Sequence, residues 1–240
     1  MAREYVEKNT AEMVRCLKEL VAIPGIFEDA PSKGAPFGKN IQKSLEYVLR
    51  MGQQMGFQVK NYDGYAGEIT AGEGNRMIGI LCHTDVVSAG EGWNTDPFDP
   101  VEKDGKLYGR GAADMKGAVA AFTVAAHRYA VENGKNFAGD VYVAGVVHEE
   151  CFEGVAARKI SEKVKPDYVV IGEASEMNLK VGQRGRAEIV VETFGVPAHS
   201  ANPEKGVNAV YKMCEAIQAI REIEPPVQDK LGKGILELTD

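Results

Sequence analysis

One imidazole and four carboxylates in this sequence could together hold metal ions. His83, Glu149, Glu150 and Glu173 each follow closely on an apolar run, and Asp114 follows the glycine-rich stretch GRGAA. Carboxylates that converge without a cation repel one another strongly, and a bound cation removes that repulsion. Imidazole and carboxylate ligands without cysteine suit Zn²⁺, Mn²⁺ or Co²⁺, and the excess of carboxylates favours two ions with a shared ligand. The residue types therefore predict a dinuclear site that binds a water and polarises a carbonyl.

Three neighbouring residues have roles that the pattern leaves open. Asp85 lies two residues after His83, so in an extended segment it could accept the second imidazole N–H, although it could instead cap a turn. Cys151 follows the glutamate pair, which leaves open a cysteine nucleophile with Glu149 as its base. Trp93 either packs a long loop or lines a substrate pocket.

Apolar runs and helical patterns predict the elements that position these residues. Residues 77–82, 141–147 and 168–172 form nearly continuous apolar runs, typical of strands covered on both faces. Helical patterns at 115–134 and 154–164 lie between them, so strands and helices alternate as in a parallel sheet with right-handed crossovers. Further expected elements are helices at the N-terminus and at 40–55, strands at 57–61 and 65–70, and a long loop at 88–111. Such sheets bind ligands at the carboxyl ends of their strands, where the candidate metal ligands are expected.

The sequence pattern changes near residue 180. Segment 180–196 is longer and more alternating, a helix follows at about 205–221, and a strand-like run at 234–240 has no following turn. We therefore expect an α/β fold in which a mostly parallel sheet sandwiched by helices forms a metal-binding catalytic domain at 1–180. The beginning of an α+β domain is expected at 181–240. This second domain is expected to be incomplete, since it does not close its sheet.

Composition limits the kinds of binding partner and the cellular compartment that we expect. Lys plus Arg total 28 and Asp plus Glu total 35, and the net charge of −7 disfavours nucleic acid and anionic membrane surfaces. The four cysteines form no Cys-x-x-Cys pair, which argues against a disulfide scaffold or a structural zinc knuckle. No stretch reaches the ~18 apolar residues of a membrane span, and the N-terminus has no continuous apolar segment. We expect a cytoplasmic protein that binds neither nucleic acid nor membrane.

Five motifs carry a resemblance to known enzymes. In chain order they are HTDVVSAGEGWNTDPFDPV, LYGRGAADMKG, HEECFEG, VVIGEAS and GVPAHSANPEKGVNA. They resemble the dinuclear-zinc hydrolase family of acetylornithine deacetylase, succinyl-diaminopimelate desuccinylase, aminoacylase, glutamate carboxypeptidase and the bacterial dipeptidases. The resemblance implies a zinc-peptidase-like catalytic domain with an inserted lid and dimerisation domain. The implied substrate is a small N-acyl amino acid or a dipeptide, because the first half looks more like the dipeptidases and the second half more like the deacylases.

Carried over residue by residue, the resemblance implies two Zn²⁺ ions in a complete active site, with Co²⁺ or Mn²⁺ as possible substitutes. Asp114 would bridge the two ions. His83 and Glu173 would complete one metal site, and Glu150 would bind the other ion. The same motifs imply a cis peptide bond between Asp114 and Met115.

The remaining motif residues take catalytic roles by the same resemblance. Glu149 would act as the general base toward a metal-bridging water, and Asp85 would orient His83. His199 matches a histidine of the lid domain that reaches the substrate carbonyl, commonly across a homodimer.

One departure from the family pattern concerns the end of the chain. Family members continue further and supply a last histidine to the second metal, whereas no histidine follows His199 here. We therefore expect a C-terminally truncated chain whose catalytic domain at 1–180 is also incomplete. Such a chain should bind about one metal ion tightly, hydrolyse little and expose apolar surface. The rival hypotheses are an inactive product that binds ligand, metal or a partner without turnover, and a cysteine-dependent hydrolase.

Overall fold

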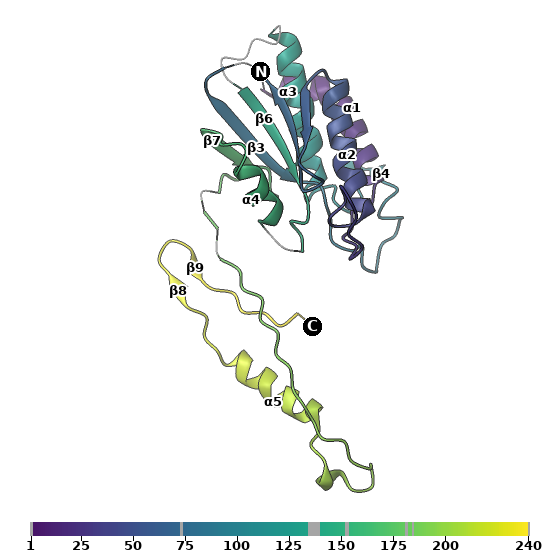
Figure 1. The fold of residues 1–240 in the computed structure, drawn as a ribbon, viewed down its shortest axis with the longest axis vertical. Helices are drawn as coiled ribbons and strands as arrows, with labels where there is room; N and C mark the ends of the chain where they lie inside the picture. The colour runs from purple at the N-terminus through teal and green to yellow at the C-terminus, as the bar shows by residue number, and fades with distance from the viewer. Residues whose placement is uncertain are drawn as a thin grey trace. The chain divides into compact units, whose positions relative to one another are not determined.

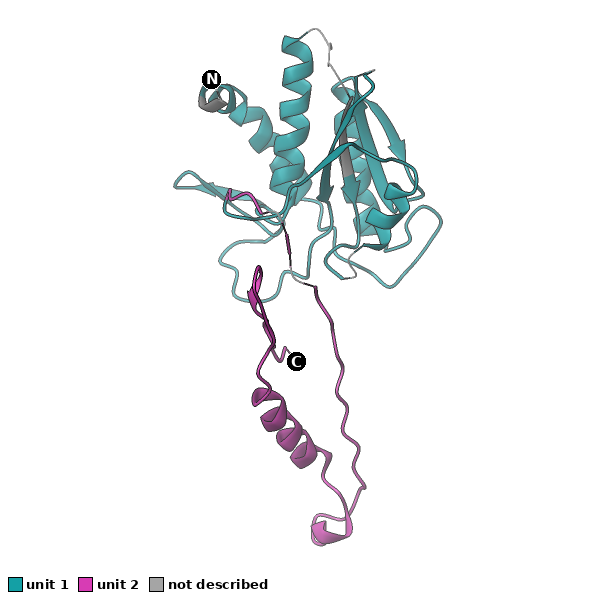
Figure 2. Cartoon of the chain, turned by 90° about the vertical axis from the view of Figure 1, so that its left-hand side faces the viewer, with its two compact units in different colours: residues 1–176 teal, residues 177–240 magenta. Residues whose placement is uncertain are grey.

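The computed structural model describes residues 2–72, 74–133, 140–151, 154–180, 182–183 and 185–239 (Figure 1). The chain divides into two compact units, Met1–Glu176 and Met177–Asp240 (Figure 2). The first unit thus ends at Glu176, whereas the sequence placed the boundary at residue 180. The functions assigned to the two parts stay predictions.

A five-stranded sheet forms the centre of the first unit, in the order β1-β2-β6-β3-β7. β3 runs parallel to both of its neighbours, β6 and β7, whereas β2 is antiparallel to β1 and β6. Only β2 therefore runs against the other four strands, which confirms the mostly parallel sheet. The strands are β1 (Gln58–Asn61), β2 (Ala66–Ala71), β3 (Met77–His83), β6 (Asp140–Val146) and β7 (Tyr168–Ile171).

Helices cover both faces of this sheet, as predicted. α3 (Lys116–Glu132) connects β3 to β6, and α4 (Val155–Ser161) connects β6 to β7 in the opposite direction across the sheet. Right-handed crossovers then put α3 and α4 on opposite faces, which Figure 1 shows. α1 (Ala2–Val21) packs on α3, and α2 (Lys39–Gln54) packs against β1 and β2. None of the helices that the structure describes is long and apolar enough to cross a bilayer.

The helices turn one apolar stripe each toward the core. In α2 the buried side chains of Ile41, Leu45 and Val48 recur at the helical period. The sheet also approaches α3 closely at Gly172, where a Cβ atom would lie 2.8 Å from Met115 Cε and 2.9 Å from Cys82 Sγ. A larger residue at Gly172 would push β7 away from α3, and with it the neighbouring Glu173.

The long loop predicted at 88–111 is partly wrong, because it contains a β-hairpin. β4 (Val101–Lys103) pairs antiparallel with β5 (Lys106–Tyr108). Asp104 and Gly105 form the two-residue turn with φ values of 52° and 72°. An Asp-Gly pair favours this turn, because both residues tolerate positive φ. The many Gly, Asp and Pro residues of the segment favoured the prediction of a loop, although the Asp-Gly pair within it indicates a hairpin turn.

The second unit is less regular than we predicted. It contains η1 (Pro203–Lys205), α5 (Ala209–Arg221) and a small hairpin of β8 (Val227–Gln228) and β9 (Gly232–Lys233). α5 begins later than the predicted helix, after the side chain of Asn208 accepts a hydrogen bond from Val210 N at 2.8 Å. The described residues of the alternating segment at 180–196 form no strand; Val196 alone pairs, in an isolated bridge with Val207.

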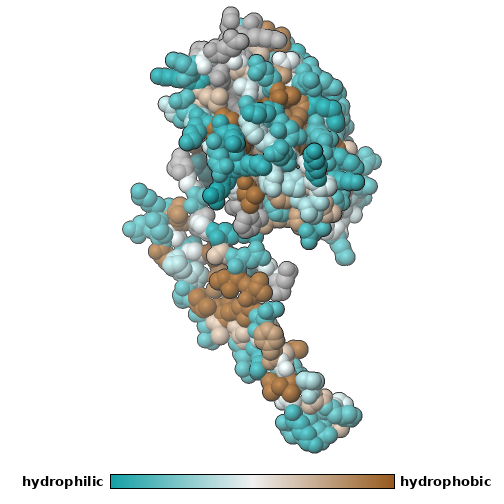
Figure 3. All heavy atoms as spheres, viewed as in Figure 1, coloured by the Kyte–Doolittle hydropathy of each residue, from teal (hydrophilic) through white to brown (hydrophobic). Residues whose placement is uncertain are grey.

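Apolar side chains are left exposed in the second unit, as Figure 3 shows. Ile189, Val190 and Phe194 expose about three quarters or more of their surface. α5 buries none of its residues. This surface agrees with the expectation of exposed apolar area.

Candidate metal centre

Parallel pairing brings three chain segments to one edge of the sheet. His83 is the last residue of β3 and lies opposite Val146, the last residue of β6. Leu81 of β3 lies opposite Ile171, the last residue of β7. The residues that follow these strand ends, including Glu149 and Glu173, therefore meet at the carboxyl edge of the sheet, as the sequence predicts.

The imidazole of His83 is the centre of the cluster. Its Nε2 lies 3.1 Å from Asp114 Oδ1, 3.7 Å from Glu149 Oε2 and 3.7 Å from Glu173 Oε1. The imidazole is 1% exposed, whereas the three carboxylates are between 31% and 56% exposed. One buried nitrogen thus faces three solvent-accessible carboxylates.

Among the residues that the structure describes, two groups of side chains have the geometry to hold a cation. One consists of His83, Glu149 and Glu173, and the other of His83, Asp114 and Glu150; within each group the ligand atoms lie within 4.8 Å of one another. These groups differ from the predicted ligand sets, because Glu149 stands among the candidate ligands and His83 is common to both. Which of these carboxylates coordinates and which acts as a base stays a prediction.

Asp85 contacts both His83 and the glutamate pair, but not in the way that the sequence indicated. His83 Nδ1 lies 3.0 Å from the backbone oxygen of Asp85 and 3.6 Å from its carboxylate Oδ1. A carbonyl oxygen only accepts, so Nδ1 carries a proton, and the tautomer is set by the backbone rather than the carboxylate. Oδ2 of Asp85 accepts a hydrogen bond from Glu150 N at 3.2 Å. The buried Asp85 thereby joins the segments that carry His83 and Glu150.

The acidic surroundings change the acid–base behaviour of His83. Burial by itself would lower its pKa, but Asp85, Glu149 and Glu173 outweigh burial and raise the pKa to about 9. In the metal-free chain at neutral pH, His83 is therefore an imidazolium that partly neutralises the carboxylates.

We expect this raised pKa to make the contribution of His83 to stability depend on pH. Because the folded-state pKa of about 9 lies above the ordinary value of 6.5, protonated His83 stabilises the fold fully below about pH 6.5. The stabilisation is lost as the pH rises through 9. The shift corresponds to about 3 kcal/mol in the free energy of unfolding.

A His83→Gln variant isolates this contribution. The variant must be compared with the wild type, because Lys116 also makes stability depend on pH. Burial lowers the pKa of Lys116 from 10.5 to about 7, and this shift changes stability in the opposite direction over an overlapping pH range. Urea unfolding with chelator present, at about pH 6 and about pH 9.5, measures the difference between wild type and variant. We expect a large difference at the lower pH and a small one at the higher pH. A difference independent of pH would contradict the raised pKa.

The donor set fits a divalent cation. Oδ1 of Asp85 is buried without a hydrogen-bond partner and lies 3.6 Å from His83 Nδ1, so this carboxylate adds negative charge beside the imidazole. Burial also raises the pKa of Glu150, with Asp114 and Asp85 contributing and His83 opposing. Imidazole and carboxylate ligands match the preferences of Zn²⁺, Co²⁺ and Mn²⁺.

The structure disfavours the cysteine alternative on chemical grounds. Burial raises the pKa of Cys151, and the charges of Asp85 and Glu150 raise it further. Cys151 is therefore a neutral thiol at pH 7, and the thiol is a much weaker nucleophile than the thiolate.

Two other site predictions concern Asp114 and His199. The peptide bond between Asp114 and Met115 is cis, which confirms what the motif implied. His199 lies in the second unit, where it is exposed and its Nδ1 accepts a hydrogen bond from Ala201 N at 3.1 Å. The residues that gather around His83 all belong to the first unit, so His199 is not one of them. Its role stays a prediction.

His148 and Lys116 are two residues near the cluster to which the sequence assigned no role. His148 has a φ of 62° and stacks on Phe37 with ring centroids 4.2 Å apart. Lys116 follows Asp114 by two residues and is completely buried. The sequence feature that could have indicated a buried Lys116 is its location at the start of an otherwise apolar, alanine-rich helix.

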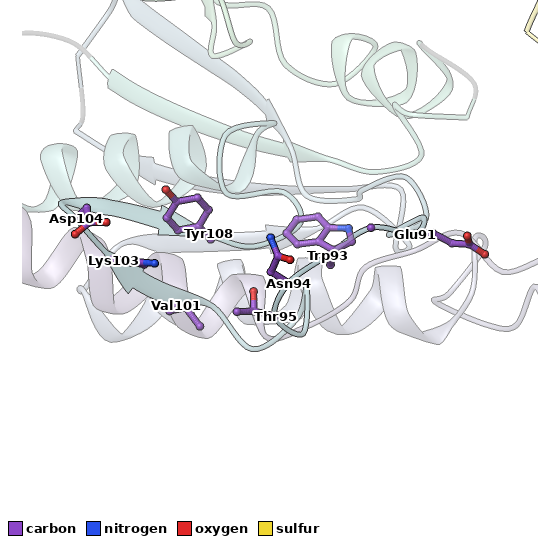
Figure 4. Close-up of a pocket in the computed structure, with 9 residues that line it drawn as sticks. Glu91, Trp93, Asn94, Thr95, Val101, Lys103, Asp104 and Tyr108 are labelled. Carbon is purple, nitrogen blue, oxygen red and sulfur yellow. The ribbon is translucent and has the colours of Figure 1, made fainter.

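A cavity of about 540 Å³ lies between the loop before β4 and the β4–β5 hairpin (Figure 4). Trp93 lines it together with Asn94 and Tyr108. The indole of Trp93 donates to the backbone oxygen of Ala89 at 2.8 Å, and the guanidinium of Arg110 lies over the ring. Trp93 thus both packs the loop and lines a cavity, but this cavity includes none of the residues around His83.

Comparisons with known proteins identify the family. The sequence pattern of Peptidase family M20/M25/M40 matches residues 79–232. A Bacillus subtilis (strain 168) protein named "Putative dipeptidase YtjP" is 41% identical over 119 residues, which are 49% of this chain and 26% of that protein. A similarly named Staphylococcus aureus (strain USA300) protein is 40% identical over 133 residues, or 55% of this chain and 27% of that protein. The matched part of the chain thus spans about a quarter of the length of these relatives.

Solved structures agree with this result. Human carnosine dipeptidase 1 is 26% identical with a TM-score of 0.60, and the match covers 80% of this chain and 43% of that chain. The M20 family metallo-carboxypeptidase Sso-CP2 of Sulfolobus solfataricus has a TM-score of 0.61 at 19% identity, covers 87% of this chain and 49% of its own, and supports the fold alone. The resemblance of the five motifs is confirmed. Because the family pattern covers more than half of the sequence, the chain belongs to peptidase family M20/M25/M40.

Proposed function

We propose that this protein is a metal-dependent hydrolase that cleaves the amide bond of a dipeptide or a small N-acyl amino acid. The observation that carries the proposal is the contact of His83 Nε2 with Asp114, Glu149 and Glu173 at the carboxyl edge of the sheet. Membership in a peptidase family gives the reaction class. The two relatives named as dipeptidases favour the dipeptide among these substrates.

Zn²⁺ is the proposed cofactor, two ions per complete site. His83, Asp114, Glu150 and Glu173 would hold them, with Asp114 as the shared ligand. Bound Zn²⁺ acts as a Lewis acid that lowers the pKa of water and polarises a carbonyl. Deprotonation of His83 at Nε2 must precede binding there, because its Nδ1 proton is engaged by the backbone oxygen of Asp85.

Glu149 is the proposed general base. Its carboxylate is 31% exposed, so water can reach it, and it lies 3.7 Å from His83 Nε2. Glu149 takes a proton from the attacking water and later delivers it to the leaving amine. Asp85 keeps the backbone of the adjacent Glu150 in place through its hydrogen bond from Glu150 N.

His199 and the second unit complete the proposal. His199 would polarise the substrate carbonyl, and the second unit would form a homodimer. Its exposed apolar side chains, among them Val190 and Phe194, are consistent with association. Location in the cytoplasm is also part of the proposal.

A substrate panel tests the proposed function. The panel contains dipeptides, N-acetyl amino acids, and a depsipeptide in which an ester replaces the amide as the control, each incubated with the protein in the presence of Zn²⁺ or Co²⁺. We expect release of free amine from dipeptides above all, because the relatives carry that name. Binding of the metal without hydrolysis of any amide would instead support an inactive protein that binds ligand or metal.

A further inference from the structure

We infer that Lys116 is a positioning residue that holds the Asp114 turn beside His83 by tying it to the end of α1. This inference rests on the proposed metal site, in which Asp114 is the shared ligand. Lys116 would touch neither metal nor substrate. It would act only through the backbone that carries Asp114.

The contacts of Lys116 cross a long distance in the sequence. Its Nζ donates to the backbone oxygens of Leu20 at 3.1 Å and Ile23 at 2.6 Å. Leu20 lies in the last turn of α1 and its oxygen also accepts from Ile23 N at 3.2 Å, whereas Ile23 lies two residues beyond the end of that helix. A carbonyl oxygen has two lone pairs, so each of the two can accept from Lys116. The side chain is completely buried, so water cannot replace these hydrogen bonds.

The segment that Lys116 binds is itself attached to the strand that carries His83. Gly25 O accepts a hydrogen bond from Val86 N at 3.1 Å, and Ile26 forms a parallel bridge with Val86. A Cβ at Gly25 would lie 3.2 Å from Thr84 O and 3.4 Å from Lys116 Nζ, so these groups are closely packed. The end of α1 therefore contacts the residues that follow His83 on one side and Lys116 on the other.

Lys116 is also packed against the turn that precedes Asp114. A Cβ at Gly111 would lie 3.2 Å from Lys116 Cδ and 2.6 Å from Val86 Cγ1. The backbone N–H of Lys116 donates to Gly111 O at 3.0 Å. Gly111, Lys116 and Val86 thus form one closely packed group, and Asp114 lies in the turn between the first two.

These contacts fix the distance between Asp114 and His83, two proposed metal ligands from different segments of the chain. Asp114 Oδ1 lies 3.1 Å from His83 Nε2 although its side chain is 56% exposed and gains little from burial. The buried link through Lys116 and the end of α1 supplies a restraint that the exposed side chain lacks. Removal of a group that holds a metal ligand in place typically lowers metal affinity by about 10- to 100-fold.

The test compares Lys116→Met with Val124→Ala in the 240-residue chain. Lys116→Met keeps the apolar stem and removes the donors. Val124→Ala removes buried volume from the same helix, away from the cluster, and serves as the control for lost packing. Urea unfolding measures the free energy of unfolding of both variants. Differences in hydrogen exchange or metal binding can then be compared between variants of known stability.

Two readouts separate positioning from a structural role. In metal-free protein, hydrogen exchange of the amides at 109–116 should be at least tenfold faster in Lys116→Met than in Val124→Ala. Titration with Co²⁺ should show at least tenfold weaker binding and an altered d–d absorption spectrum in Lys116→Met alone. If Lys116→Met does not fold, Lys116→Gln takes its place, because its shorter side chain does not span both carbonyls.

Equal exchange at 109–116 and equal Co²⁺ binding in the two variants would overturn the inference. Failure of the wild-type chain to bind Co²⁺ would instead overturn the proposed metal site, while the exchange comparison would still decide whether Lys116 holds the turn.

Discussion

Glu149→Gln is expected to lower the turnover of a dipeptide by about 10²- to 10⁴-fold, the usual contribution of general acid–base catalysis. The amide has nearly the size of the carboxylate but does not accept a proton from water at neutral pH. If Glu149 is the base and not a ligand, the metal content of the variant stays that of the wild type. Steady-state kinetics together with metal analysis of the purified variant measure both quantities.

Glu149 could also be a metal ligand, because the structure brings it together with His83 and Glu173 in one of the two possible ligand groups. A ligand role would make Glu149→Gln lose metal as well as turnover, which would reverse the assignment. Glu150→Gln is expected to lose metal, since Glu150 is a proposed ligand. Glu162→Gln, at a carboxylate that is 60% exposed and paired with Arg158, is the control for removal of a carboxylate and should change neither quantity.

The sheet edge was predictable because its signal is local. The apolar runs that end near His83, Glu149 and Glu173 each form a strand, and neighbouring parallel strands necessarily bring their carboxyl ends together. The sequence therefore located the cluster without any knowledge of distances.

Asp85 shows what such reasoning misses. Alternation in an extended segment directed its carboxylate toward His83, but the backbone oxygen of Asp85 is the nearer partner, and the carboxylate also accepts from Glu150 N. Backbone acceptors are present at every residue, so no residue type marks the ones that matter. The contact to Glu150 joins residues far apart in the chain and has no periodic signal.

Lys116 and the second unit were missed for different reasons. A lysine at the start of a helix normally points to solvent, and only the convergence of the end of α1 on Lys116 explains its burial. In the second unit, the alternating pattern at 180–196 is typical of a strand, but a strand also needs a partner for its backbone hydrogen bonds. Among the described residues none pairs with it in a ladder, so the pattern alone does not produce a sheet.

Removal of metal is expected to abolish hydrolysis, and Zn²⁺ or Co²⁺ should restore it. The reason is that a cation must lower the pKa of water before Glu149 can take a proton from it, and that the cation also polarises the carbonyl. In the metal-free chain His83 is instead protonated, with a pKa of about 9. Metal must displace that proton, so the apparent affinity should rise by up to about tenfold per pH unit below pH 9. Exhaustive chelation, followed by titration with metal at several pH values, measures both effects in a preparation that hydrolyses a dipeptide.

Asp114→Ala provides the matched variant for this experiment. Loss of the proposed shared ligand should leave the variant inactive after metal is returned, because Asp114 is the carboxylate nearest to His83 Nε2. Metal analysis should show fewer ions per chain than in Glu149→Gln. Iodoacetamide supplies the opposing control. If hydrolysis survives exhaustive chelation but is lost on alkylation, the metal-dependent mechanism is wrong and Cys151, despite the raised pKa of its thiol, is the nucleophile.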